Sequence, residues 1–145
     1  MQKFNNKYDV PELAGYSVDG KTFYVDRHMP RFMFHNGKKI DTYKYLLIHE
    51  TTEFTLRTQL GFSYNHAHEL ATIAEWWQFI KDNGKIYKAY NDLCQKYVKF
   101  TEDENKRNIP PDLENPWTGR AYTLADLKIK YARSAIRVAY SKLQD

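Results

Sequence analysis

The sequence of 145 residues contains one cysteine, five prolines, six glycines and no long apolar run. A lone cysteine, Cys94, cannot form the disulfides that small secreted proteins need, and it excludes a CxxC zinc or redox site. We therefore expect a reducing compartment and a buried thiol. The longest apolar run, residues 45–48, is far too short to cross a bilayer. The scattered prolines and glycines exclude collagen-like and low-complexity chains.

Neither positive nor negative charge strongly predominates. Lys and Arg number 22 against 18 for Asp and Glu, a net charge of +4. This mild excess allows a nucleic-acid partner but does not indicate one. The first twenty residues lack the apolar segment of a secretory signal, so we expect a cytoplasmic protein that does not bind membranes. With 42% hydrophobic residues, the length fits a single domain with one core.

The apolar pattern predicts an α+β fold. Residues 1–40 form the strand-rich part, because apolar and polar residues alternate around Asp19-Gly20, which is typical of a hairpin with a two-residue turn. Asn36-Gly37 predicts a second turn. We expect a small antiparallel sheet here and no strands after residue 40.

After residue 40 the apolar residues recur with the spacing of an α-helix, which predicts a helical core over residues 41–103. The first helix is capped at Asp41 or Thr42 and stopped at Gly61, and the second is capped by Ser63 and reaches about residue 81. A third covers about residues 85–102. Residues 104–122 form a Pro-rich arm, and residues 123–145 form a basic amphipathic helix. Lys130, Arg133 and Arg137 line one face of that last helix, which makes them candidates for binding a partner.

The first long helix contains the sequence His-Glu-Thr-Thr-Glu at residues 49–53. His49 and Glu53 lie one turn apart, on the apolar side of the helix. A buried imidazole and a buried carboxylate are costly unless they are paired or bind a metal. On the second helix, His68 and Glu75 also face inward. If the two helices pack as a hairpin, His49, Glu53 and His68 converge as the three ligands of a catalytic zinc site, with Glu75 as fourth ligand or as a support for an imidazole.

Glu50 follows a candidate ligand but points about 100° away around the helix axis. From there it can accept a proton from a metal-bound water, the role of the glutamate in HExxH metalloproteases, with Glu53 in place of the second histidine. A carboxylate is a harder ligand, in the acid–base sense, than an imidazole. Fe²⁺ and Mn²⁺ therefore remain alternatives to Zn²⁺.

The segments GYSVDGKTFYVDRHMP, LLIHETTE and LGFSYNHAHELATIAE, with IPPDL at residues 109–113, resemble small uncharacterised zincin-like proteins of phages and prophages. The resemblance implies a zincin-like fold, with a helix bearing HExxE followed by a helix bearing Ala67-His68 and Glu75. It also implies that an edge strand of the cleft binds an extended peptide. Phe23, Tyr24 and Val25 are the candidates for that strand. The location would be the host cytoplasm, with virion association as the alternative.

Together these features predict a metal-dependent hydrolase of zincin type that acts on a peptide or protein. Two alternatives stay open. One is a phage-encoded binding or structural protein with a structural metal or a metal-free network of His and Glu. The other is a metal-dependent phosphoesterase. The sequence leaves the oligomeric state undetermined.

Overall fold

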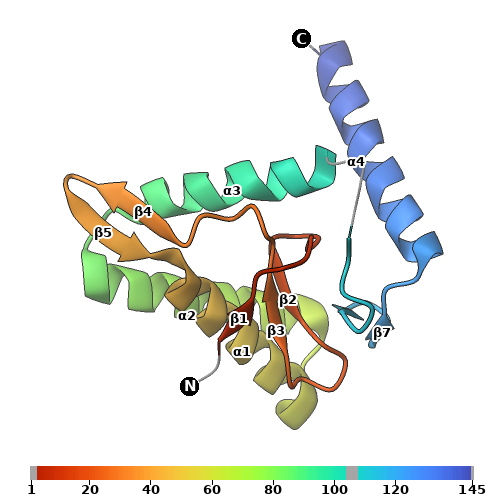
Figure 1. Ribbon diagram of the computed structural model, residues 1–145, viewed down its shortest axis with the longest axis horizontal. Coiled ribbons are helices and arrows are strands. Elements are labelled where there is room, and N and C mark those ends of the chain that lie inside the picture. The colour runs from red at the N-terminus through yellow and green to blue at the C-terminus, as the bar shows by residue number, and fades with distance from the viewer. Residues whose placement is uncertain (1–2, 104–107, 145) are drawn as a thin grey trace.

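The structure, a computed structural model, describes residues 3–103 and 108–144 and has the expected α+β fold with four helices (Figure 1). The elements follow the chain as β1 (Phe4–Asn5), β2 (Ala14–Tyr16), β3 (Phe23–Val25), β4 (Phe32–His35), β5 (Lys38–Asp41), α1 (Thr42–Leu60), α2 (Tyr64–Asn83), α3 (Tyr87–Asp103), β6 (Glu114–Asn115), β7 (Arg120–Ala121) and α4 (Leu124–Gln144).

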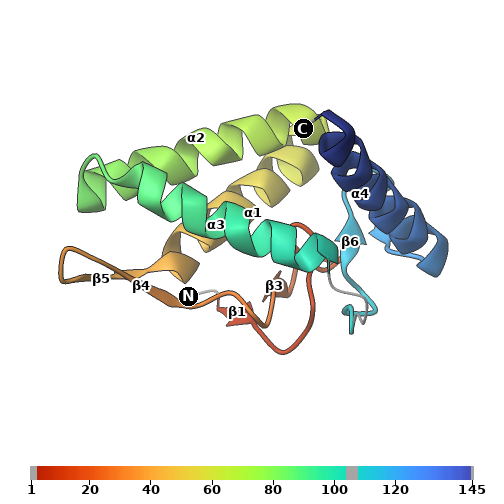
Figure 2. The same ribbon diagram turned by 90° about the horizontal axis from the view of Figure 1, so that it is seen from above.

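Helices α1 and α2 form the expected hairpin, and local signals define its ends. The Asp41 side chain accepts a hydrogen bond from the backbone N–H of Tyr43 at the start of α1. Gly61 ends α1 in the left-handed conformation, with φ 70°, and Ser63 caps α2. Since only residues 61–63 join the helices, they lie side by side, and α3 crosses the same body (Figure 2).

The N-terminal sheet corrects two sequence predictions. Its strand order is β1-β3-β2, and β1 is parallel to β3, so the sheet is mixed and not purely antiparallel. The β2–β3 hairpin is confirmed, but its loop spans residues 18–21, because the N–H of Ser17 still donates to the carbonyl of Thr22. The second turn is confirmed: Asn36 and Gly37 link β4 to β5 with φ values of 50° and 79°, as a two-residue hairpin turn requires.

The expectation of no strands after residue 40 was wrong. Strands β6 and β7 pair within the segment expected as a Pro-rich arm. Leu113 in this segment is buried and bridges to Ser17 beside β2. These pairings depend on distant parts of the chain, so the local sequence has no alternating pattern that could show them. The first residues of the predicted arm, 104–107, lie outside the described residues.

The core lies between the α1–α2 hairpin, α3 and the strands. Its largest fully buried side chains are Tyr90 and Phe79, whose rings stack 4.8 Å apart. Cys94 is buried in the same cluster, as expected. Helix α4 stands away from this body (Figures 1 and 2). None of the helices, over the residues that the structure describes, combines the length and apolarity that crossing a membrane requires.

Candidate metal centre

Three candidate ligand atoms meet between α1 and α2. Nε2 of His49 lies 3.2 Å from Nδ1 of His68 and 3.3 Å from Oε2 of Glu53, and that oxygen is 3.2 Å from the same nitrogen of His68. A tetrahedral ion with bonds of about 2.0 to 2.1 Å places its ligand atoms about 3.3 to 3.4 Å apart. The triangle therefore has the dimensions of three zinc ligands, from the residues that the sequence predicted.

Hydrogen bonding among these groups does not satisfy all of them. Nδ1 of His49 lies 2.9 Å from Oε1 of Glu75. If that nitrogen carries the only proton of a neutral ring, the Nε2 lone pair faces a lone pair of Glu53, and the two repel. A proton on Nε2 of His49, a proton on Nδ1 of His68 or a cation at the centre of the triangle relieves this repulsion.

The pKa values of His49 and Glu53 reflect the same close contacts. Burial alone lowers the pKa of His49, but the hydrogen bonds with Glu53 and Glu75 outweigh burial and raise it well above its usual value. For Glu53, burial raises the pKa, but the hydrogen bonds from His49 and His68 lower it overall. Both groups thus favour their charged forms, and a divalent cation would compete with the proton that His49 otherwise binds.

Glu75 holds His49 from the opposite side of its ring. One carboxylate oxygen accepts from Nδ1 of His49, and the other accepts a 2.6 Å hydrogen bond from the hydroxyl of Tyr90. Both oxygens are thus engaged away from the triangle. Of the two roles left open by the sequence, this geometry fits that of a carboxylate orienting an imidazole and not that of a fourth ligand.

Glu53 is held in a similar way. The Tyr16 hydroxyl donates a 2.9 Å hydrogen bond to Oε1 of Glu53, which leaves Oε2 directed at the histidines. Arg57 in turn donates a 2.7 Å hydrogen bond to the Tyr16 hydroxyl and forms an ion pair with Glu114. This series of contacts links α1, β2 and β6, and it orients one carboxylate oxygen of Glu53 for a cation.

Glu50 differs from every other carboxylate of the cluster. It is 8% exposed, yet no group of the described residues donates a hydrogen bond to it. Burial raises its pKa; the charge of His49 opposes this, and those of Glu53 and Glu75 add to it, with a net rise. Such a carboxylate takes up a proton readily, as a general base must.

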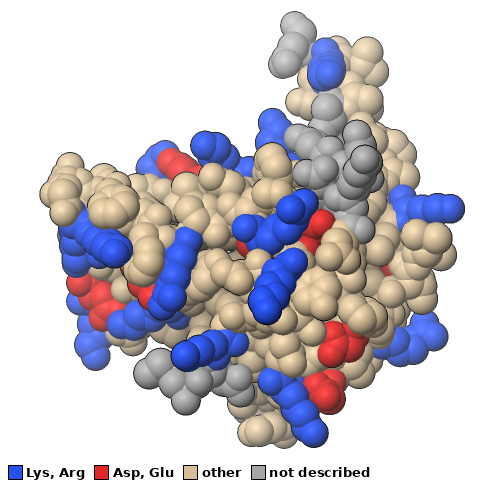
Figure 3. All heavy atoms as spheres, in the orientation of Figure 1, with Lys and Arg blue, Asp and Glu red and all other residues tan. Residues whose placement is uncertain are grey.

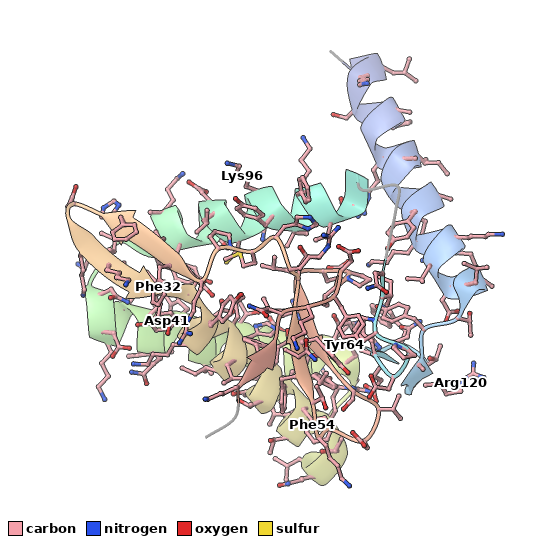
Figure 4. All side chains as sticks on the ribbon, viewed as in Figure 1. Phe32, Asp41, Phe54, Tyr64, Lys96 and Arg120 are labelled. Carbon is pink, nitrogen blue, oxygen red and sulfur yellow. The ribbon has the colours of Figure 1, made fainter. Side chains whose placement is uncertain are left out.

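All of these groups face one cleft of about 390 Å³, which is lined by His49, Glu50, Glu53, His68 and Glu75, by β2, and by side chains of α3 and of the segment around β6. Tyr64 packs against the rings of His68 and Trp117, 5.6 and 4.8 Å away. In Figure 4 Tyr64 lies between the N-terminal sheet and the segment that carries β7. The site is thus open to a ligand: the His68 side chain is 51% exposed.

The edge strand of the cleft is β2, which corrects the prediction for Phe23, Tyr24 and Val25. Those residues form β3, the central strand, which pairs on both sides and is buried. Residue 15 of β2 lies opposite Tyr24, and Ser17 bonds to Thr22, so the backbone groups of Ala14 and Tyr16 point away from β3. Residues 112–114 cover this side of the strand at its Tyr16 end, because Val18 donates to the carbonyl of Asp112 and Ser17 bridges to Leu113.

The predicted basic stripe on α4 is partly engaged within the molecule. Lys130 forms an ion pair with Glu12 at the rim of the cleft, and Arg137 lies 3.3 Å from Glu102 of α3. Arg133 is exposed. The stripe is therefore not one continuous solvated surface.

A second acidic group, Asp9 with Asp26 and His28, is also compact. Its carboxylate oxygens accept hydrogen bonds from Arg27 and from the backbone N–H groups of Val10, His28 and Asn108. These bonds satisfy the group as a structural network that ties the N-terminal loop to residue 108.

Sequence analysis missed the residues that position the candidate ligands, which are Tyr16, Arg57, Tyr90 and Glu114. Arg57 lies one turn after Glu53, so the helical spacing offered a signal. Glu114 offered none, because its contact with Arg57 spans 57 residues.

No protein-family model, curated protein or solved structure matches the chain. The case for a function therefore depends on the site itself.

Proposed function

We propose that the protein is a metal-dependent hydrolase of zincin type that cleaves peptide bonds. The observation that carries the proposal is the triangle of His49 Nε2, His68 Nδ1 and Glu53 Oε2, with sides of 3.2 to 3.3 Å, in the same cleft as Glu50. Glu50 has no hydrogen-bond donor among the described residues and lines the cleft, as suits a carboxylate that exchanges a proton with a bound ligand.

Two histidines and one carboxylate suit Zn²⁺, and the same set suits Fe²⁺ or Mn²⁺. The bound cation would act as a Lewis acid toward a carbonyl oxygen and make water more acidic. Glu75 holds the His49 ring so that Nε2 faces the centre, and Tyr16 fixes Glu53. Glu50 accepts the proton of the attacking water and then returns it to the leaving amine.

An extended peptide would lie in the cleft along the Ala14 end of β2, because residues 112–114 cover the Tyr16 end of that edge. The backbone of Ala14 would pair with it as in an added strand. This pairing brings the peptide backbone along the cleft wall that ends at Tyr16, whose hydroxyl already touches Glu53. A peptide is favoured over a phosphodiester, because Arg57 is engaged by Glu114 and Tyr16 and Lys130 is engaged by Glu12.

The proposal retains the resemblance to zincin-like phage proteins and a location in the cytoplasm. It is favoured over a purely structural role because Glu50 has no hydrogen-bond partner among the residues that the structure describes. In that other role, Glu50 would be dispensable for function.

The test is Glu50→Gln, an isosteric change that removes the base. Purified wild type, loaded with Zn²⁺, is incubated with a peptide library beside nucleotide substrates, and cleavage is followed by mass spectrometry. We expect peptide cleavage by wild type, a loss of at least 100-fold in Glu50→Gln, and unchanged metal content. Glu69→Gln, at an exposed glutamate beside His68, is the control and should keep full activity. Equal cleavage by wild type and Glu50→Gln would refute the proposal, as would turnover of nucleotides alone.

A further inference from the structure

Helix α4 carries an apolar stripe that nothing covers among the described residues. The stripe consists of Ala125, Ile129, Ala132, Ile136, Ala139 and Leu143. All six are exposed, and the three large side chains are 54%, 65% and 83% exposed in chain order. In Figure 3 the projecting helix carries mostly tan atoms with scattered blue ones. Isolated exposed apolar residues are ordinary, but six in one row indicate an interface.

The spacing of this stripe is 4, 3, 4, 3 and 4 residues, the repeat of a coiled-coil seam. The stripe also faces away from the body, because the half-buried residues of α4 lie on the other side of the helix: Asp126, Leu127, Lys130 and Tyr131. We call these six residues the α4 seam. Among the described residues, none covers the seam, so a second helix can dock there.

We infer that α4 is a dimerisation element, whose seam pairs with the α4 seam of a second copy in antiparallel orientation. Small and large residues alternate along the seam, and the alternation is self-complementary in one orientation only. A two-fold axis near residue 134 puts Ile129 opposite the partner's Ala139, Ala132 opposite the partner's Ile136, and Ala125 opposite the partner's Leu143. Every layer then joins one large and one small side chain, which gives close packing.

A parallel pair would instead place Ile against Ile and Ala against Ala in successive layers, and the Ala layers would leave voids. In the antiparallel pair the two bodies lie on opposite sides of the helices, because each seam faces away from its own body. The pair buries on the order of 1,000 Å², which is near the lower end for specific interfaces. We therefore expect a reversible dimer that forms at micromolar concentrations.

Charge acts against this dimer but does not prevent it. Lys128, Arg133 and Lys142 flank the seam, and the antiparallel pairing brings Lys128 near the partner's Lys142 and Arg133 near the partner's Arg133 at the two-fold axis. Such exposed like charges repel weakly and are screened by salt. Burial of the large seam residues from both copies is the greater effect. The dimer should therefore tighten as the salt concentration rises, whereas binding of an acidic partner would weaken.

The test is sedimentation equilibrium of the full chain from 5 to 500 μM at low and high salt. We expect wild type to dimerise, more strongly at high salt. Ile136→Glu, at an exposed position, should raise the dissociation constant at least tenfold without changing the circular dichroism spectrum. Leu124→Glu is the matched control, since Leu124 is 71% exposed on α4 but lies outside the seam; it should dimerise as wild type does.

Orientation is tested by mixing the single variants Ala125→Cys and Leu143→Cys under mild oxidation. The antiparallel pair predicts a disulfide between the two variants and none within either alone. Self-linked products would overturn the orientation. A wild type that stays monomeric at 500 μM would overturn the dimer, and a monomer that binds vesicles with anionic lipids would assign the seam to a membrane surface instead.

Discussion

The hydroxyl of Tyr90 in α3 donates a 2.6 Å hydrogen bond to Oε2 of Glu75 in α2, and Oε1 of the same carboxylate faces Nδ1 of His49 in α1. One carboxylate thus joins three helices. Tyr90 is fully buried, and burial next to Glu75 raises the pKa of its hydroxyl well above the usual value, so it stays a donor. The candidate ligand His49 is therefore oriented by the core of the protein.

Tyr90→Phe removes this hydrogen bond and leaves a buried oxygen of Glu75 without a donor. We expect a loss of about 1 to 3 kcal/mol in the free energy of unfolding, measured with urea. We also expect the affinity for Zn²⁺ to fall about tenfold, measured by competition with a chromophoric chelator. Tyr87→Phe is the control. Tyr87 packs against the ring of Tyr90, and its hydroxyl forms no hydrogen bond among the described residues. Equal losses in both variants would mean that the Tyr90 hydroxyl does not support the site.

Arg57→Met tests the series of hydrogen bonds that holds Glu53 through Tyr16. Because the side chains of Arg57 and Glu114 are only 13% and 7% exposed, the variant leaves a mostly buried carboxylate unpaired. We expect a loss of about 2 to 4 kcal/mol in the free energy of unfolding. The double variant Arg57→Met with Glu114→Leu should recover most of the loss, since no charge is then left unpaired. Lys88→Met, which breaks an exposed pair with Asp92, should cost less than about 0.5 kcal/mol. Strictly additive losses in the double variant would contradict the coupling.

The pH dependence of stability should report on Asp82, which joins α2 to α1. A hydrogen bond from Lys44, with others from Tyr45 and Gln78, lowers the pKa of Asp82 to about 2 against the opposing effect of burial. Its pKa in the unfolded chain is about 3.9. The stabilisation is thus present in full above about pH 4 and is lost as the pH falls toward 2.

We therefore expect Asp82→Asn to be less stable than wild type at pH 7 and the difference to shrink between pH 4 and pH 2. Urea unfolding at each pH measures it. Asp92→Asn, which removes an exposed partner of Lys88, should show a small difference that changes little. A difference for Asp82→Asn that stays constant down to pH 2 would refute the role of its ionisation.

Local signals made the helices and the grouping of His49, Glu53 and His68 predictable. Asp41, Gly61 and Ser63 define the ends of α1 and α2 through contacts with residues two to five positions away. The inward spacing of His49 and Glu53 follows from helix geometry. Their meeting with His68 needed only the short connection between the two helices.

Long-range pairing was not predictable in this way. Strand β1 is two residues long and pairs in parallel with β3, so the local pattern of Phe4–Asn5 shows nothing of it. For the same reason β3 was taken as an edge strand, although β1 and β2 cover both of its sides. The partners of Glu53 come from β2 and, through Arg57, from β6, and only the folded chain brings them together.

The most direct test of the account is the metal content of protein purified without a metal-binding tag. Elemental analysis of wild type should give one zinc per chain, and His49→Ala combined with His68→Ala should give none. Glu50→Gln should keep the metal, since the account gives Glu50 no role as a ligand. A wild type without stoichiometric metal, with the same stability to urea in the presence and absence of a chelator, would mean that His49, Glu53 and His68 form a metal-free buried network.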